Sequence, residues 1–146
     1  MVRKIKVLAL VVLGLCCQLY GQPAVVDSLE QKLAQTTDLK QQVDLLHQMS
    51  SASWDYNFEK GYQFACQGEK LAAKIEYQSG LVNALADQGL YFYFTGSFTR
   101  ALEVLRQAYF MGGKEPDRFK AGIAIRIGNA HRRMGNTDSA RYFFEQ

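Results

Sequence analysis

The chain has few cysteines and no catalytic or cofactor motif. Only three cysteines occur in 146 residues, and two of them, Cys16 and Cys17, lie in an N-terminal apolar segment. Once that segment is removed, Cys66 has no partner for an intramolecular disulfide. No phosphate-cradling glycine loop, serine-nucleophile elbow or zinc-binding signature is present. We therefore expect no catalytic, cofactor-binding or metal-binding residues and no enzyme activity.

The chain also lacks an apolar run long enough to cross a membrane. Basic residues precede an apolar run of eleven residues, Val7 to Cys17, and Gly21 follows shortly after. A membrane span needs about 20 apolar residues, whereas this layout is typical of a secretory signal peptide. We predict a signal peptide over residues 1–21 and export, to the periplasm in a Gram-negative source. The alternatives are a retained N-terminal membrane anchor and lipid attachment at one of the two cysteines.

There is no excess charge once this segment is set aside. Three of the seventeen basic residues lie in it, which leaves fourteen basic against fourteen acidic residues. A neutral chain gives no reason to expect a nucleic-acid partner. The distribution is uneven, because residues 100–146 hold nine basic and five acidic residues. We expect the C-terminal part to be locally cationic.

Small and large residues recur at a fixed spacing. The pairs thirty-nine residues apart are Gly89 with Gly128, Gly96 with Gly135, Ala101 with Ala140, and Leu105 with Phe144. Gly61 and Gly68 lie forty residues before Ala101 and Ala108, which indicates a degenerate first repeat. Self-similarity at this period is typical of stacked helical hairpins, with small residues where two helices approach closely. The sequence predicts an all-α fold, an α-solenoid of about three antiparallel helix pairs with a period of 39–40.

Turn and cap signals divide the chain further. We expect an N-terminal helix and linker over 22–37, with the helix starting at the capping-box pattern that begins at Asp27. The repeat domain covers 38–146, and its first unit has helices over about 38–54 and 59–75. Glycines at 96 and 135 end the first helices of the next two units. Because the sequence stops inside the last expected helix, we interpret the third unit as truncated.

Three further expectations concern caps, linker and core. Ser97 and Asn136 are expected to cap the second helices through their side chains. Gly112 and Gly113 end the second unit, and Pro116 starts the third. The large side chains expected to fill the second and third units are Leu85, Phe92, Phe98, Leu105, Ile127, Tyr142 and Phe144.

The spacing of these residues resembles that of tetratricopeptide repeats (TPR) over about residues 38–146. The family's first aromatic position is Leu85 or Ala124 here, its leucine is Gln88 in the second unit, and its tyrosine is His131 in the third. The period also exceeds the family's usual length of about 34 residues. The resemblance implies a concave groove lined by the first helix of each pair, which binds a protein or peptide ligand.

Candidate groove residues follow from this register. They are Asn83, Asp87, Leu90 and Tyr93 in the second unit, and Arg126, Asn129, Arg132 and Arg133 in the third. Arg126, Asn129 and Arg133 share one helix face, and arginine can hold a carboxylate through two parallel hydrogen bonds. We interpret them as a candidate clamp for an acidic side chain or a C-terminus. A solvated charged face is the competing interpretation.

The remaining chemically reactive residues favour structural roles. His47 and His131 have no carboxylate or cysteine at metal-ligand spacing, and no histidine is placed to activate Cys66. In the aromatic block 91–94, Phe92 is expected inside, and its two C-terminal neighbours either pack on the next repeat or face the groove.

These observations favour an exported, non-catalytic scaffold that binds a protein or peptide. The alternative is the periplasmic sensor region of a truncated transmembrane signalling receptor, a histidine kinase or transcriptional regulator. In that case a membrane helix and an output domain, catalytic or DNA-binding, would follow residue 146.

Overall fold

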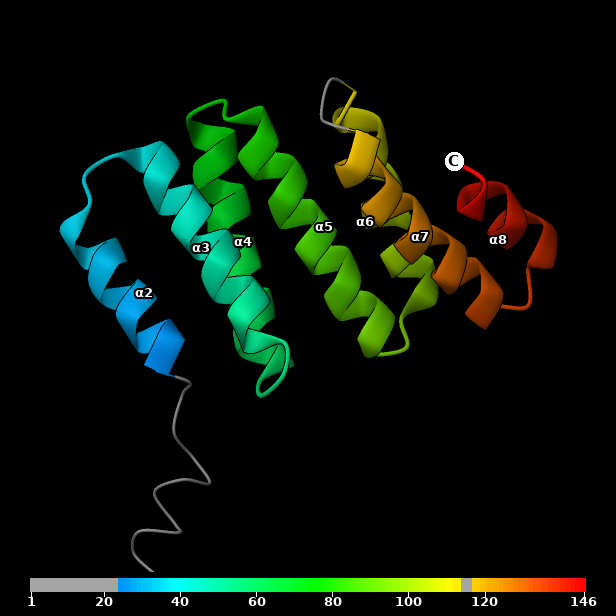
Figure 1. Cartoon of the computed structure of the whole chain (residues 1–146), viewed down its shortest axis with the longest axis horizontal. Helices are drawn as coiled ribbons and strands as arrows, with labels where there is room; N and C mark the ends of the chain where they lie inside the picture. The colour runs from blue at the N-terminus through cyan, green and yellow to red at the C-terminus, as the bar shows by residue number, and fades with distance from the viewer. Residues whose placement is uncertain (1–23, 114–116) are drawn as a thin grey trace, which may run out of the picture.

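The computed structural model describes residues 24–113 and 117–146, and this part of the chain is helical without strands. The predicted signal peptide, its cleavage site and Pro116 lie outside the described residues. The helices, shown in Figure 1, are α2 (Ala24–Gln35), α3 (Leu39–Ser53), α4 (Phe58–Lys74), α5 (Gln78–Phe94), α6 (Phe98–Met111), α7 (Asp117–Arg133) and α8 (Thr137–Phe144). The predicted all-α class is confirmed.

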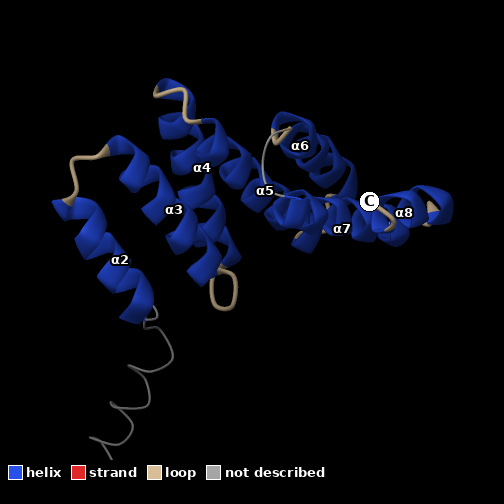
Figure 2. Ribbon diagram, turned by 45° about the horizontal axis from the view of Figure 1, so that its top comes forward, coloured by secondary structure: helices blue, strands red, loops and turns tan. Residues whose placement is uncertain are grey.

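The helices pack as antiparallel pairs in series. The pairs are α3 with α4, α5 with α6, and α7 with α8, and α2 packs on α3 as α4 packs on α5. The first helices α3, α5 and α7 also contact one another from pair to pair, whereas the second helices meet only through side chains in the described part of the chain, as where the rings of Tyr109 and Phe143 lie 6.2 Å apart. The first helices therefore form the inner layer of a helical-repeat fold, and the second helices form the outer layer. Figure 2 shows the pairs following one another along the molecule.

The turns within the pairs are nearly identical in two places. Gly96 and Gly135 have φ of +78° and +80°, the left-handed region in which glycine carries no side-chain penalty. The amide of Ser97 donates to the Phe92 carbonyl at 2.8 Å, and the amide of Asn136 donates to the His131 carbonyl at 2.9 Å. These bonds close helix ends of the Schellman type, so the predicted role of both glycines is confirmed.

The predicted side-chain caps at these turns are wrong. Ser97 and Asn136 occupy the N-cap positions of α6 and α8, but neither side chain accepts a hydrogen bond from the following turn. Their ψ values of 59° and 74° depart from the extended backbone that a capping side chain needs. Asp38, with ψ of 113°, does cap α3, and its Oδ1 accepts from the Lys40 amide at 2.9 Å.

The recurring glycines lie where a large side chain of the paired helix crosses them. A Cβ added to Gly89 would stand 2.5 Å from Leu105 Cγ, and one added to Gly128 would stand 2.5 Å from Phe144 Cε1. Since both distances are far below van der Waals contact, only glycine permits this approach. The register of the repeat therefore reflects packing between the two helices of a pair.

Two predictions about the ends of the array are wrong. Helix α2 begins at Ala24, so Asp27 lies in its first turn instead of starting it. In α8, Tyr142 and Phe144 are 58% and 46% exposed and Phe143 is the buried aromatic residue, although Phe144 does lie against Gly128, as its pairing with Leu105 predicts. The reason is that no further helix of the described chain covers the outer side of α8, so Phe144 is covered only on its Gly128 side, whereas Phe143 joins the core formed with α6 and α7.

Candidate binding surface

One repeat position places a charged or titratable residue on each helix of the inner layer. His47 on α3, Asp87 on α5 and Arg126 on α7 follow one another at spacings of forty and thirty-nine residues. The Nδ1 atom of His47 lies 2.7 Å from Oδ2 of Asp87. The Nη1 atom of Arg126 donates to the carbonyl of Ala86 at 3.4 Å. The three side chains therefore form a row across the inner layer.

Asp87 is the buried member of this row. Its side chain is 4% exposed, against 36% for His47. The hydrogen bond to Asp87 raises the pKa of His47 above its ordinary value, although burial opposes the shift. The positive charge of Arg126 acts in the opposite direction to Asp87 and lowers the pKa of His47.

This pairing corrects one sequence-based expectation. Asp87 was expected to be an exposed groove residue, but it is buried and pairs with His47, which has no carboxylate at metal-ligand spacing in the sequence. A carboxylate forty positions away is invisible to a search for local metal spacing. The repeat period was the signal that could have found it, because equivalent positions on neighbouring first helices lie side by side.

The other predicted groove residues divide between two places. Asn83, Leu90 and Tyr93 on α5 are half-buried, and so is Asn129 on α7. Arg133 is exposed, and its guanidinium lies 5.7 Å from the centre of the Phe98 ring, at the turn end of the inner layer. Arg132 is also exposed. The structure thus brings Arg126 to the pair formed by His47 and Asp87, and directs Arg133 away from it.

Arg126, Arg132 and Arg133 of α7 have no carboxylate partner in the described residues. The ion pairs present there are that between His47 and Asp87 and one of 3.3 Å between Lys60 and Glu30. Arg126, Arg132 and Arg133 therefore leave uncompensated positive charge on the third pair. Within the described part, this end of the inner layer is the one suited to an anionic ligand.

Other kinds of site find less support. Among the described residues, no three histidine, cysteine or acidic side chains gather as a metal would require. His131 stacks on Phe143 with ring centres 5.8 Å apart, and burial lowers its pKa. Cys66 is half-buried. No helix in the described ranges is long and apolar enough to span a bilayer.

Comparisons with known proteins add no further assignment. No model of a known protein family matches the chain, and no curated protein matches its sequence.

Proposed function

We propose that the chain is a non-catalytic scaffold of the tetratricopeptide type that binds a peptide segment of another protein on its inner layer. The observation that carries this proposal is the row formed by His47, Asp87 and Arg126. His47 and Asp87 pair with each other, so Arg126 is the member of the row that has no carboxylate partner among the described residues. A preformed row of this kind offers an anion site without much side-chain ordering on binding.

The chemistry of α7 favours a carboxylate ligand. Arg126 donates one Nη1 hydrogen to the carbonyl of Ala86, and its other N–H groups can donate to a ligand. Asn129 lies one turn further along the same face, where its amide can orient a second oxygen. An acidic side chain or a free C-terminus of a peptide satisfies both groups.

The test is selection from a displayed library of random peptides, followed by affinity measurements with the enriched peptides. We expect enrichment of Asp and Glu, and about tenfold weaker binding to Arg126→Ala, because one charge-assisted hydrogen bond is lost. Binding to the parent should weaken with added salt, and the variant should show a flatter salt dependence. Fluorescence anisotropy of labelled peptides measures both effects.

Arg106→Ala is the matched control, because Arg106 is exposed on α6 in the outer layer. It should bind the selected peptides like the parent. Equal affinity of parent and Arg126→Ala would rule out the clamp, and a failure to enrich any peptide would rule out the scaffold function itself.

We also propose that the scaffold acts outside the cytoplasm, from the basic and apolar pattern of residues 1–21. Expression of the full chain in a Gram-negative host should give a periplasmic product that starts at Gln22, as mass spectrometry can establish. Leu13→Asp breaks the apolar run and should keep the product in the cytoplasm. Recovery of the uncleaved parent in membranes would instead indicate an anchor, and an uncleaved cytoplasmic parent would contradict export.

A further inference from the structure

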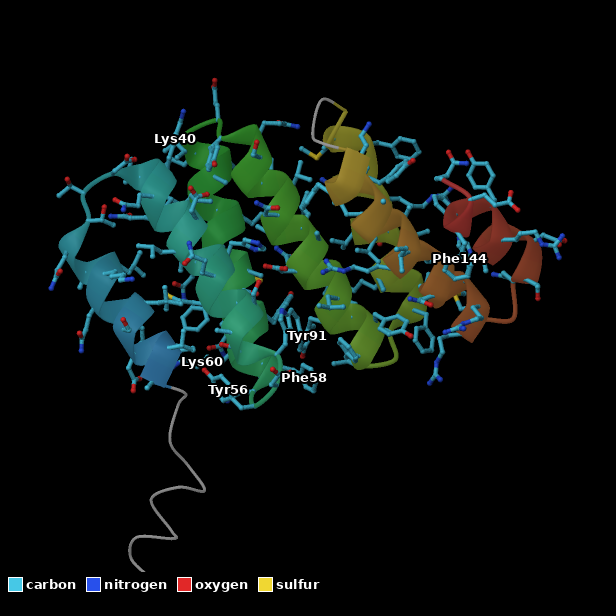
Figure 3. All side chains as sticks on the ribbon, in the orientation of Figure 1. Lys40, Tyr56, Phe58, Lys60, Tyr91 and Phe144 are labelled. Atoms are coloured by element: carbon cyan, nitrogen blue, oxygen red, sulfur yellow. The ribbon has the colours of Figure 1, made fainter. Side chains whose placement is uncertain are left out.

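Aromatic residues recur at the turns within the pairs, where the inner and outer layers meet. Trp54, Phe94 and Arg133 occupy one repeat position at the ends of α3, α5 and α7, at spacings of forty and thirty-nine. Phe58 and Phe98 begin α4 and α6, again forty residues apart. These turns lie along the lower edge of Figure 1, and Figure 3 places Phe58 there. We name Trp54, Phe58, Tyr93, Phe94, Phe98 and Arg133 the turn-edge strip.

The strip is continuous from the first pair to the third. Phe58 stacks on Phe94 with ring centres 5.2 Å apart and planes 25° apart, which joins the first pair to the second. Tyr93 continues the contact to Phe98 at 5.7 Å, and the guanidinium of Arg133 covers Phe98 at 5.7 Å. Every pair of the array therefore contributes to one surface.

This surface borders the core, against which Tyr93 packs, and it is open to solvent at Phe58 and Phe94. Phe58 is 43% exposed and Phe94 is 54% exposed, although each stacks on the other. Exposed apolar area gains about 25 cal/mol per Å² when it is removed from water. A connected apolar patch that stays exposed is typical of an interaction site.

A hollow of about 260 Å³ opens in the strip beside the turn between α5 and α6. Its lining consists of Tyr93, Phe94, Gly96, Phe98 and Arg133. The volume is several times the roughly 30 Å³ that a water molecule occupies in the liquid, so the hollow can accept a side chain. Its walls are aromatic, and its single charged lining residue, Arg133, has no carboxylate partner in the described residues.

We propose that the turn-edge strip binds a peptide of a partner protein in which a carboxylate stands next to an aromatic or branched aliphatic side chain. The apolar side chain enters the hollow, and the carboxylate pairs with Arg133. An anionic bilayer fits less well, because the exposed acids Asp55 and Glu59 lie at the other end of the strip. This site goes beyond the proposed function, since it lies at the turns and not on the row that contains Arg126.

The only tryptophan of the chain, Trp54, belongs to the strip and reports on its occupancy through fluorescence. The probes are tryptophan-free synthetic peptides with a central Phe-Glu, and matched peptides with Phe-Gln or Ala-Glu. We expect Phe-Glu to change the Trp54 emission with at least about tenfold tighter binding than either matched peptide. In Arg133→Gln the advantage of Glu over Gln should disappear, and in Phe94→Ala all binding should weaken.

Controls separate this site from the inner layer and from folding defects. Arg132→Gln and Phe110→Ala remove an exposed cation and an exposed aromatic residue outside the strip, so both should bind like the parent. Arg126→Ala should also bind Phe-Glu normally, even where it has lost the library-selected peptides. Phe94→Ala should remain folded, with a cooperative thermal transition and only a modest decrease in melting temperature, because more than half of this side chain is exposed although it stacks on Phe58.

Three outcomes would overturn the proposal. The first is no change in Trp54 emission with Phe-Glu at about 1 mM, a concentration at which even weak specific binding is visible. The second is equal affinity for the Glu and Gln peptides. The third is a Trp54 response to vesicles of phosphatidylcholine and phosphatidylglycerol but not to peptides, which would make the strip a membrane-contact edge.

Discussion

Gly89→Ala is expected to lower the free energy of unfolding by about 1–3 kcal/mol, because it overpacks the interface between α5 and α6. The new Cβ would stand 2.5 Å from Leu105 Cγ and 2.6 Å from Cδ2, and Leu105 is completely buried. Alanine gains about 1 kcal/mol over glycine in helix propensity, which is too little to offset the displacement of a core side chain. Equilibrium unfolding in urea measures the difference.

Gly122→Ala is the matched control on α7. Gly122 is exposed, and no atom lies within 4 Å of its added Cβ. It should therefore stabilise the protein by up to about 1 kcal/mol through helix propensity alone. In a Leu105→Ala background, Gly89→Ala should cost much less, because the clashing atoms are gone. Equal stability of Gly89→Ala and the parent would disprove the glycine register.

Asp87→Asn is expected to cost about 1–2 kcal/mol near pH 6, because it removes a charge-assisted hydrogen bond to a partly exposed histidine. The pKa of His47 in the folded protein is raised above its ordinary value of 6.5 by the hydrogen bond to Asp87. A raised pKa gives stability that is fully present below the unfolded value and is lost as pH rises through the folded value. The parent should therefore lose stability above about pH 6.5, and the variant should lose little.

Other charges around His47 set the position of this transition. Asp44 raises the pKa of His47 and Arg126 lowers it, so Arg126→Ala should move the loss of stability to higher pH. Urea unfolding at closely spaced pH values from about 5.5 to 8.5 covers the range in which histidine titrates. Equal slopes of stability against pH for the parent and Asp87→Asn would show that the pair contributes nothing measurable.

The repeat period in the sequence predicted more features of the fold than of the binding surface. Gly89 and Gly96 were identified by spacing alone, because a close helix approach and a left-handed turn each demand glycine. The side-chain caps at Ser97 and Asn136 were wrong, because capping depends on a backbone angle that residue type does not fix. Tyr142 and Phe144 were expected inside from their repeat positions, but Tyr142 is exposed and Phe144 is covered only where it lies on Gly128.

The row formed by His47, Asp87 and Arg126 shows the limit of reading one segment at a time. Each residue, taken alone, resembles a solvated or core side chain, and only superposition of the three units brings them together. Arg133 shows the opposite case. Its helix face suggested a place beside Arg126, but Arg133 is the last residue of α7, and its guanidinium lies over the ring of Phe98 at the turn. Side-chain direction depends on local partners as well as on helix register.

The layering of the array has a mechanical consequence. In the described part of the chain, the first helices approach one another from pair to pair, whereas the second helices meet only through side chains such as Tyr109 and Phe143. Packed interiors resist compression. The contacts through α3, α5 and α7 should therefore keep the spacing of the inner helices nearly constant when the array bends. We therefore expect bending of the array to change the spacing of the outer helices more than the spacing of the inner helices.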